Sequence, residues 1–226
     1  MKKVFFSCVA VATLMVFLSA GSVFAAENGN TGFYVGVSGG YAIPQTMTVT
    51  DEYDPYHADT TLKNGYLAGV KAGWLTPFTK RIMAMELEYN YIFGTDFDNG
   101  KNVNLMGKGF VTLDGTIKIH AILSNLKARY PEGRVHPYVG FGVGYSYFQV
   151  GDMTARGAGG SVILPGESQG AFCWQLLAGL DFDITPNFGV GIGYKYFATK
   201  PTIGGSIEAD FDYKVSVFTV GLAYTF

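Results

Sequence analysis

Few residues in this sequence have the side chains that catalysis or metal binding requires. The chain contains three histidines, His57, His120 and His136, and two cysteines, Cys8 and Cys173. A hydrolytic triad needs a nucleophile, a histidine and an acid that converge, and a zinc site needs several closely spaced ligands. These residues are far apart and show no such spacing. The sequence therefore predicts no catalytic residue, no cofactor and no metal.

Charged residues at every second position form a second group with possible chemistry. Glu86 and Glu88 are two residues apart, so both would point to the same side of a strand. The same alternation places six charges on one predicted face: Lys71, Glu86, Glu88, Lys118, Asp181 and Lys195. Such a set could form an ion path or gate, or a structural network in which every buried charge is paired. We favour the structural network.

These residues lie in eight segments in which apolar residues alternate with small or polar ones, the pattern of strands with one apolar face. The segments are 32–43, 66–75, 83–93, 111–124, 138–148, 172–184, 188–196 and 218–226. In the fourth, the apolar set is predicted to face outward and to oppose Lys118, His120 and Ser124; its members are Val111, Leu113, Ile117, Ile119, Ala121 and Leu123.

The connections between the segments alternate in length. Three are tight turns, at 76–81, 130–134 and 185–187, and four are long and polar, near 44–63, 95–108, 150–170 and 198–212. Short and long connections on opposite sides of an even number of antiparallel strands are typical of an outer-membrane barrel. The sequence thus predicts an all-β fold, a transmembrane eight-stranded up-and-down β-barrel with both chain ends on the short-turn side.

The composition indicates which face meets the bilayer. Charged residues make up only 15% of the chain and aromatics another 15%, against roughly 25% charge in soluble domains. The small and charged residues share one face, which fits the narrow interior of eight strands. Exposed to water, the other face would be an apolar patch larger than soluble monomers show. Aromatic residues gather at both ends of the strands, as in the two belts that anchor a barrel in lipid.

Four stretches carry a resemblance to a known family: MELEYNYIF, LSNLKARYPEGRVHPYVGFGVGYSY, LLAGLDFDITPNFGVGIGYKYF and the final VGLAYTF. They resemble the bacterial outer-membrane β-barrel domain family, which groups small OmpA-, OmpX- and OmpW-like barrels and porin-family surface antigens. The resemblance implies an integral protein of a Gram-negative outer membrane, and no particular activity. It also implies that the last apolar stripe is read by the outer-membrane assembly machinery; this stripe comprises Phe218, Val220, Leu222, Tyr224 and Phe226.

His120 is the strongest candidate for a catalytic residue. A lipid A deacylase of this barrel class would need a histidine and a serine two residues apart on one strand face, with an acid nearby. Ile122 occupies the position of that serine, and Ser124 lies two residues further on. The sequence therefore favours a protein that is not an enzyme.

The N-terminal residues have the features of a secretory signal peptide. Lys2 and Lys3 precede an apolar run, and a cleavage motif ends at Ala25. We expect a cleaved helical signal peptide at 1–25 and the barrel domain at 26–226. Cleavage would leave Cys173 as a single cysteine, predicted to be a packing residue. The formal net charge of −2 becomes more negative on cleavage, so nothing indicates nucleic-acid binding.

The sequence thus predicts an outer-membrane barrel with a structural and surface-interaction role. Its expected partners are outer-membrane lipid and lipopolysaccharide, the assembly machinery, and an extracellular partner at the long loops. The long loops could equally be a cation site, a lid or plain solvated loops. A narrow OmpW-like pore for small or hydrophobic solutes is the first alternative, and a lipid A-modifying enzyme is the second.

Overall fold

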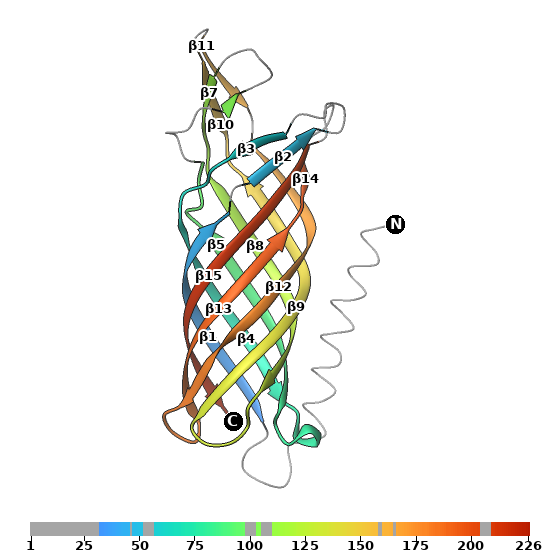
Figure 1. The fold of residues 1–226 in the computed structure, drawn as a ribbon, viewed down its shortest axis with the longest axis vertical. Coiled ribbons are helices and arrows are strands. Elements are labelled where there is room, and N and C mark those ends of the chain that lie inside the picture. Colours follow the sequence, from blue (N-terminus) through green and yellow to red (C-terminus); the bar gives the residue numbers. More distant parts are fainter. Residues whose placement is uncertain are drawn as a thin grey trace.

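The computed structural model describes residues 32–45, 47–51, 57–97, 103–104, 110–157, 160–164, 166–203 and 209–226. Eight long strands form one tilted barrel (Figure 1): β1 (Phe33–Pro44), β4 (Gly65–Leu75), β5 (Met83–Phe93), β8 (Ile117–Arg129), β9 (Val135–Val150), β12 (Glu167–Asp183), β13 (Phe188–Thr199) and β15 (Ala209–Thr225). The predicted fold class is confirmed. The predicted signal peptide and its cleavage at Ala25 lie outside the described residues.

Each strand pairs antiparallel with its neighbour in the chain order, and the last pairs with the first. The β1–β15 register runs from Tyr34 opposite Thr225 to Pro44 opposite Val215. The amide of Phe226 then donates to the Phe33 carbonyl oxygen at 2.9 Å. This pairing closes the barrel, so that no barrel strand is left with an open edge.

Three tight turns lie at one end of the barrel, with the C-terminus (Figure 1). The first contains the 3-10 helix η1 (Pro77–Thr79), after which Lys80 and Arg81 have φ of 53° and 65°. The second contains Gly133 at φ 82°, where a residue without Cβ avoids strain. In the described part of the chain, no helix is long and apolar enough to cross a membrane.

The long connections lie at the opposite end and contain short strands of their own. They include β2 (Met47–Asp51), β3 (His57–Thr60), β6 (Val103–Asn104), β7 (Phe110–Asp114), β10 (Met153–Gly157), β11 (Gly160–Leu164) and β14 (Thr202–Ile203). β2 pairs with the start of β15, and β14 also pairs there. β6, β7, β10 and β11 form a separate four-stranded sheet beyond the barrel rim (Figure 1). The pairing of β2 and β14 with β15 therefore extends the barrel wall at this end, and among the described residues the four-stranded sheet is not paired with it.

The alternation of faces is as predicted in seven of the eight strands. The apolar set points outward, with exposed fractions such as 53% for Val37, 61% for Val139 and 59% for Val220. The opposite set is mostly buried inside the barrel.

The predicted phase of β8 was wrong. Ile117, Ile119, Ala121 and Leu123 are fully buried, whereas Ile122 is 55% exposed. Leu123 lies opposite Glu88 in the register, and directly paired residues point to the same side of a sheet. Because Glu88 is buried, Leu123 must face inward too. The reason for the error is that the inside of the barrel is apolar at this level, so the usual rule of polar inside and apolar outside reverses.

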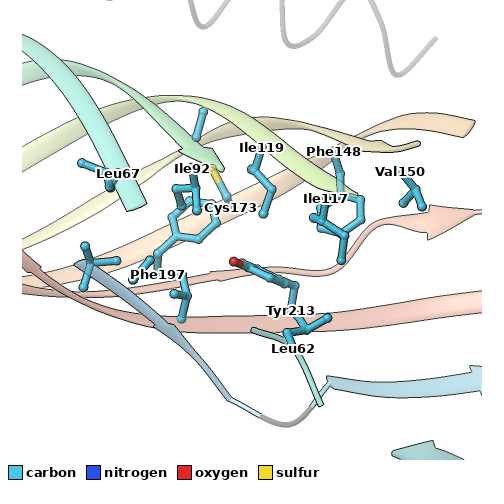
Figure 2. Packing of buried hydrophobic residues seen from close by; sticks show 14 of the residues in the cluster. Leu62, Leu67, Ile92, Ile117, Ile119, Phe148, Val150, Cys173, Phe197 and Tyr213 are labelled. Carbon is cyan, nitrogen blue, oxygen red and sulfur yellow. The ribbon is translucent and has the colours of Figure 1, made fainter. Parts of the chain in front are cut away.

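The interior therefore has two layers. Towards the long loops lies an apolar layer, most of which is drawn in Figure 2. Its members are Ala42, Leu62, Leu67, Ile92, Phe97, Ile117, Ile119, Ala121, Leu123, Phe148, Val150, Cys173, Phe197, Tyr213, Val215 and Val217. Towards the short turns lies a polar layer built around two glutamates. Apart from Leu62 and Phe97, which lie in the connections, both layers are made by the inward positions of the same strands.

Candidate functional site

The first centre of the polar layer is the Glu86 carboxylate on β5, which is 2% exposed. The Tyr34 hydroxyl, on β1, donates to Oε1 at 2.5 Å. Lys71 Nζ, on β4, lies 3.4 Å from the same oxygen, and Lys127 Nζ, on β8, lies 3.2 Å from it. Glu86 thus ties together four strands with one hydroxyl donor and two ammonium groups.

The second centre is Glu88, which follows Glu86 by two residues on β5 and points to the same side of the strand. Lys195 on β13 forms an ion pair with Oε1 from across the lumen. Asn125 Nδ2 and Gln175 Nε2 donate to Oε2 at 3.0 and 2.8 Å, and Gln175 also donates to Asn125 Oδ1 at 2.8 Å. The amides bring β8 and β12 into the network, so that both oxygens of Glu88 are satisfied.

Lys127 joins this layer to a small cavity. Its Nζ lies 3.4 Å from Asp181 Oδ2 and 3.8 Å from the centroid of the Tyr138 ring. The Asp181 side chain is 26% exposed and lines a cavity of about 80 Å³ at the short-turn end. Gly189, Gly191, Gly193 and Gly221 also line this cavity, and Gly191 lies directly opposite Asp181 in the β12–β13 register. A Cβ would lie 2.6 Å from Asp181 Oδ1 if placed on Gly191 and 2.5 Å from the Tyr138 hydroxyl oxygen if placed on Gly193, so glycine leaves room for these two side chains.

Glycine is also required at Gly73, in the wall beside Tyr34. A Cβ on Gly73 would lie 2.3 Å from the Tyr34 ring carbon Cζ. The ring therefore lies flat against bare backbone, and its hydroxyl reaches Glu86. A side chain at position 73 would displace the Tyr34 ring and with it the hydroxyl that donates to Glu86.

The structure brings together five of the six predicted network residues: Lys71, Glu86, Glu88, Asp181 and Lys195. The prediction for Lys118 was wrong, because Lys118 is exposed on the outer face of β8. Its place is taken by Lys127, 3% exposed, which the sequence reading missed. Asn125 and Gln175 were also missed as members. The sequence signal for these residues was the stretch LSNLKARY. In it Leu123, Asn125 and Lys127 occupy every second position, and Leu126 lies on the opposite face.

The apolar layer was missed as well. Every barrel strand contributes to it, and all its members are at most 7% exposed. Phe148 and Tyr213 meet edge to face with ring centroids 5.7 Å apart, and the Tyr213 hydroxyl donates to Thr95 Oγ1 at 3.3 Å. Cys173 is fully buried within this layer, in accordance with its predicted packing role. The signal was the presence of Leu67, Ile92, Phe148 and Phe197 on the small and polar faces.

His120 lies on the outer wall, and the prediction that it faces inward was wrong. Its ring stacks on Tyr91, with centroids 4.7 Å apart, and its Nδ1 lies 2.7 Å from the Tyr89 hydroxyl. Ile122 is the next outward residue on β8. Among the residues that the structure describes, no three His, Cys, Asp or Glu side chains gather as metal ligands.

His136 ties the second short turn to the end of β12. Its Nδ1 lies 2.8 Å from the Tyr130 carbonyl oxygen and its Nε2 lies 2.8 Å from Asp183 Oδ2. In the same turn the Tyr130 hydroxyl donates to Glu132 Oε2 at 3.1 Å, and this hydrogen bond raises the pKa of Tyr130. His136 is buried and holds backbone and carboxylate together, a positioning role for the turn.

The last outward stripe is laid out as predicted. Phe218, Val220, Leu222, Tyr224 and Phe226 all lie on the outer face and are between 44% and 59% exposed. Tyr224 and Phe226 meet edge to face at the short-turn end. The stripe forms a continuous apolar surface along β15.

Comparisons with known proteins agree with this architecture. The model of the outer membrane protein beta-barrel domain matches residues 10–226, and no curated protein sequence matches the chain. Among solved structures, Neisserial surface protein A is 17% identical, with 88% of this chain and 100% of that chain covered and a TM-score of 0.49. The outer membrane protease OmpT from Escherichia coli is 10% identical, with 88% and 99% covered and a TM-score of 0.51. The attachment invasion locus protein Ail of Yersinia pestis is 18% identical, with 85% and 98% covered and a TM-score of 0.41.

At 10% identity, the likeness to OmpT shows a shared fold alone. The family model, in contrast, covers nearly the whole chain, and its description agrees with the closed antiparallel barrel and its apolar outer wall. The chain therefore belongs to the outer membrane protein beta-barrel domain family and is an integral protein of the outer membrane.

Proposed function

We propose that this protein is a sealed, non-enzymatic barrel that supports the outer membrane and presents a surface through its long connections. Barrels of this class have short periplasmic turns and longer extracellular loops. On that orientation the polar layer faces the periplasm, and the sheet of β6, β7, β10 and β11 stands outside the cell.

The apolar layer is the observation that supports a sealed interior. The apolar layer takes side chains from all eight barrel strands, and thirteen of its members are at most 3% exposed: Ala42, Ile92, Phe97, Ile117, Ile119, Ala121, Leu123, Phe148, Cys173, Phe197, Tyr213, Val215 and Val217. Among them, the fully buried rings of Phe148 and Tyr213 lie against each other edge to face. Ions need polar groups or water in place of their hydration shell, and the described side chains of this layer are apolar apart from the Tyr213 hydroxyl, which is hydrogen-bonded to Thr95.

The alternative of a narrow pore has one feature in its favour. The cavity at the short-turn end is polar, and Lys71 and Asp181 are partly exposed within it. Conduction would require the apolar layer to move aside. In a planar bilayer the purified protein should therefore show at most small and infrequent openings. A steady, large conductance of the wild-type protein would overturn the proposal in favour of a pore.

A matched pair of substitutions sharpens this test. Phe148→Ala removes a fully buried ring from the apolar layer, whereas Phe141→Ala removes a ring from the outer face of the same strand. We expect the first to increase the conductance and the second to leave it unchanged. Equal conductance of both variants and the wild type would show that Phe148 does not seal the lumen.

The surroundings of His120 support the absence of a deacylase activity. Its described hydrogen-bond partner is a tyrosine hydroxyl rather than a carboxylate, and Ile122 stands where the serine would be needed. Purified protein should leave lipopolysaccharide acylated. Deacylation that is abolished by His120→Ala would contradict the proposal.

We propose two protein partners at opposite ends of the molecule. The stripe from Phe218 to Phe226 offers the assembly machinery a continuous apolar edge during insertion, as the family implies. The sheet beyond the rim offers an extracellular partner a β surface. Replacing residues 153–164 with a short Gly-Ser turn should leave the barrel folded and abolish attachment to host cells or matrix proteins; unchanged attachment would exclude this sheet as the contact.

A further inference from the structure

The outer wall carries a polar cluster on a surface that is otherwise apolar. Lys118 and His120 both point outward from β8. In the register, His120 lies between Tyr91 on β5 and Tyr147 on β9, and Tyr89 is the next outward residue on β5. These five residues, here called the rim cluster, lie on the long-loop half of the wall. At that height an outward tyrosine indicates the interface rather than the middle of the bilayer.

The imidazole of His120 is held in one orientation. Its ring stacks on Tyr91 at 4.7 Å with an interplanar angle of 23°, and the Tyr89 hydroxyl lies 2.7 Å from Nδ1. When the Tyr89 hydroxyl donates to Nδ1, the ring proton lies on Nε2, and the doubly protonated ring also has an N–H there; in the other neutral tautomer Nδ1 donates to the hydroxyl oxygen and Nε2 is an acceptor. In the first two forms Nε2 is a hydrogen-bond donor to an outside anion, and the stacking on Tyr91 fixes its direction.

Lys118 adds a full positive charge two residues away on the same face. Within the described residues it forms no ion pair. The acids of the neighbouring strand β5, Glu86 and Glu88, point into the lumen. Asp96, on the connection that follows β5, accepts a hydrogen bond from the Ile117 amide at 3.2 Å. A lysine on the lipid face is unfavourable unless it lies at the interface, and there an anion can offset its charge.

We propose that the rim cluster binds the phosphorylated head group of an outer-leaflet lipid. Lys118 supplies the charge, since lysine binds phosphate as a point charge, and His120 supplies a directed N–H. The acyl chains would lie along the apolar wall below, where Ile122 and Leu126 are about half exposed. This inference depends on the outer-membrane location and is independent of the sealed lumen.

The test measures lipid binding by the full barrel in detergent. The probe is bis-phosphorylated lipid A, with dephosphorylated lipid A as the comparison, and the readout is the lipid-bound fraction by native mass spectrometry. Lys118→Gln removes the charge, and His120→Phe keeps a ring to stack on Tyr91 but removes the N–H. Because charge-assisted hydrogen bonds are the strong ones, we expect each variant to bind about tenfold more weakly.

Lys80→Gln is the matched control, since it makes the same charge change in the first short turn and should bind like wild type. A heat-dependent shift on a detergent gel verifies that each variant is folded. Wild-type binding by both Lys118→Gln and His120→Phe would overturn the proposal. Equal binding of dephosphorylated lipid A would also overturn it, by assigning the contact to acyl chains. Displacement of lipid A by an equal concentration of inorganic phosphate would reassign the cluster to a free anion.

Discussion

Among the residues of the polar layer, we expect substitution of Lys127 to cause the largest loss in the free energy of unfolding. Its side chain is 4% exposed and contacts Glu86, Asp181 and the face of Tyr138. Lys127→Met keeps most of the aliphatic chain and deletes the charge. The substitution therefore leaves the two carboxylates with fewer partners while changing the packing little.

The size of the loss follows from what remains around each carboxylate. Removing one partner of a buried ion pair costs about 3–5 kcal/mol in the free energy of unfolding. Glu86 keeps Lys71 and the Tyr34 hydroxyl, and Asp181, at 26% exposure, can be hydrated from the cavity. We therefore expect a loss at the lower end of the range, about 3 kcal/mol.

The assay is urea unfolding of the protein in lipid vesicles, followed by the fluorescence of Trp74 and Trp174. Lys80→Met, at an exposed turn position, is the control and should change stability by less than about 0.5 kcal/mol. Adding Glu86→Gln to Lys127→Met should cost less than the sum of the single losses, because the pair is coupled. A loss below about 1 kcal/mol for Lys127→Met, or strict additivity in the double variant, would refute the reasoning.

Three further predictions concern the wall, the outer stripe and the apolar layer. Gly73→Ala should destabilise the barrel by more than about 1 kcal/mol, because its Cβ would lie 2.3 Å from the Tyr34 ring; Gly39→Ala, with nothing within 4 Å of its Cβ, should not, as urea titration of both will tell. Phe226→Ala should lower insertion into the outer membrane of cells more than folding into detergent micelles, and equal losses would make this ring a lipid contact only. Cys173 should react with a maleimide only after unfolding, since it is fully buried; rapid labelling of the folded barrel would show that the apolar layer admits solvent.

The alternation of residues was enough to predict the strands and most of their faces. Val35 and Val37 against Gly36 and Ser38 show the typical case, in which period 2 and side-chain size agree. The short turns were equally legible, because TPFTKR and YPEGR contain residues that end strands. Closure is expected because an open strand edge cannot persist in lipid, and the pairing of Tyr34 with Thr225 confirms it.

The site was only partly predictable. β8 misled because an apolar interior and an interfacial outer face reverse the usual signs, which placed Lys118 and His120 on the wrong side. The partners across the lumen could not be read from spacing either. Lys195 reaches Glu88 although the two are 107 residues apart, a contact that depends on how the closed barrel is staggered. Lys127 was hidden because its neighbour Leu126 was not recognised as lipid-facing.

The division of the interior into two layers has a consequence for insertion. Before β1 meets β15, the sheet is open and both of its faces can touch lipid. In the half near the long loops both faces are mostly apolar, with the rim cluster at the outer edge as the exception, so most of this half can lie in hydrocarbon without a completed wall. In the other half, Glu86 and Glu88 draw their partners from strands around the whole circumference, and an open sheet would leave those charges facing lipid. The long-loop half, which must cross the membrane during insertion, can thus contact lipid before the barrel closes. The short-turn half becomes compatible with the bilayer only when closure of the barrel encloses its charges.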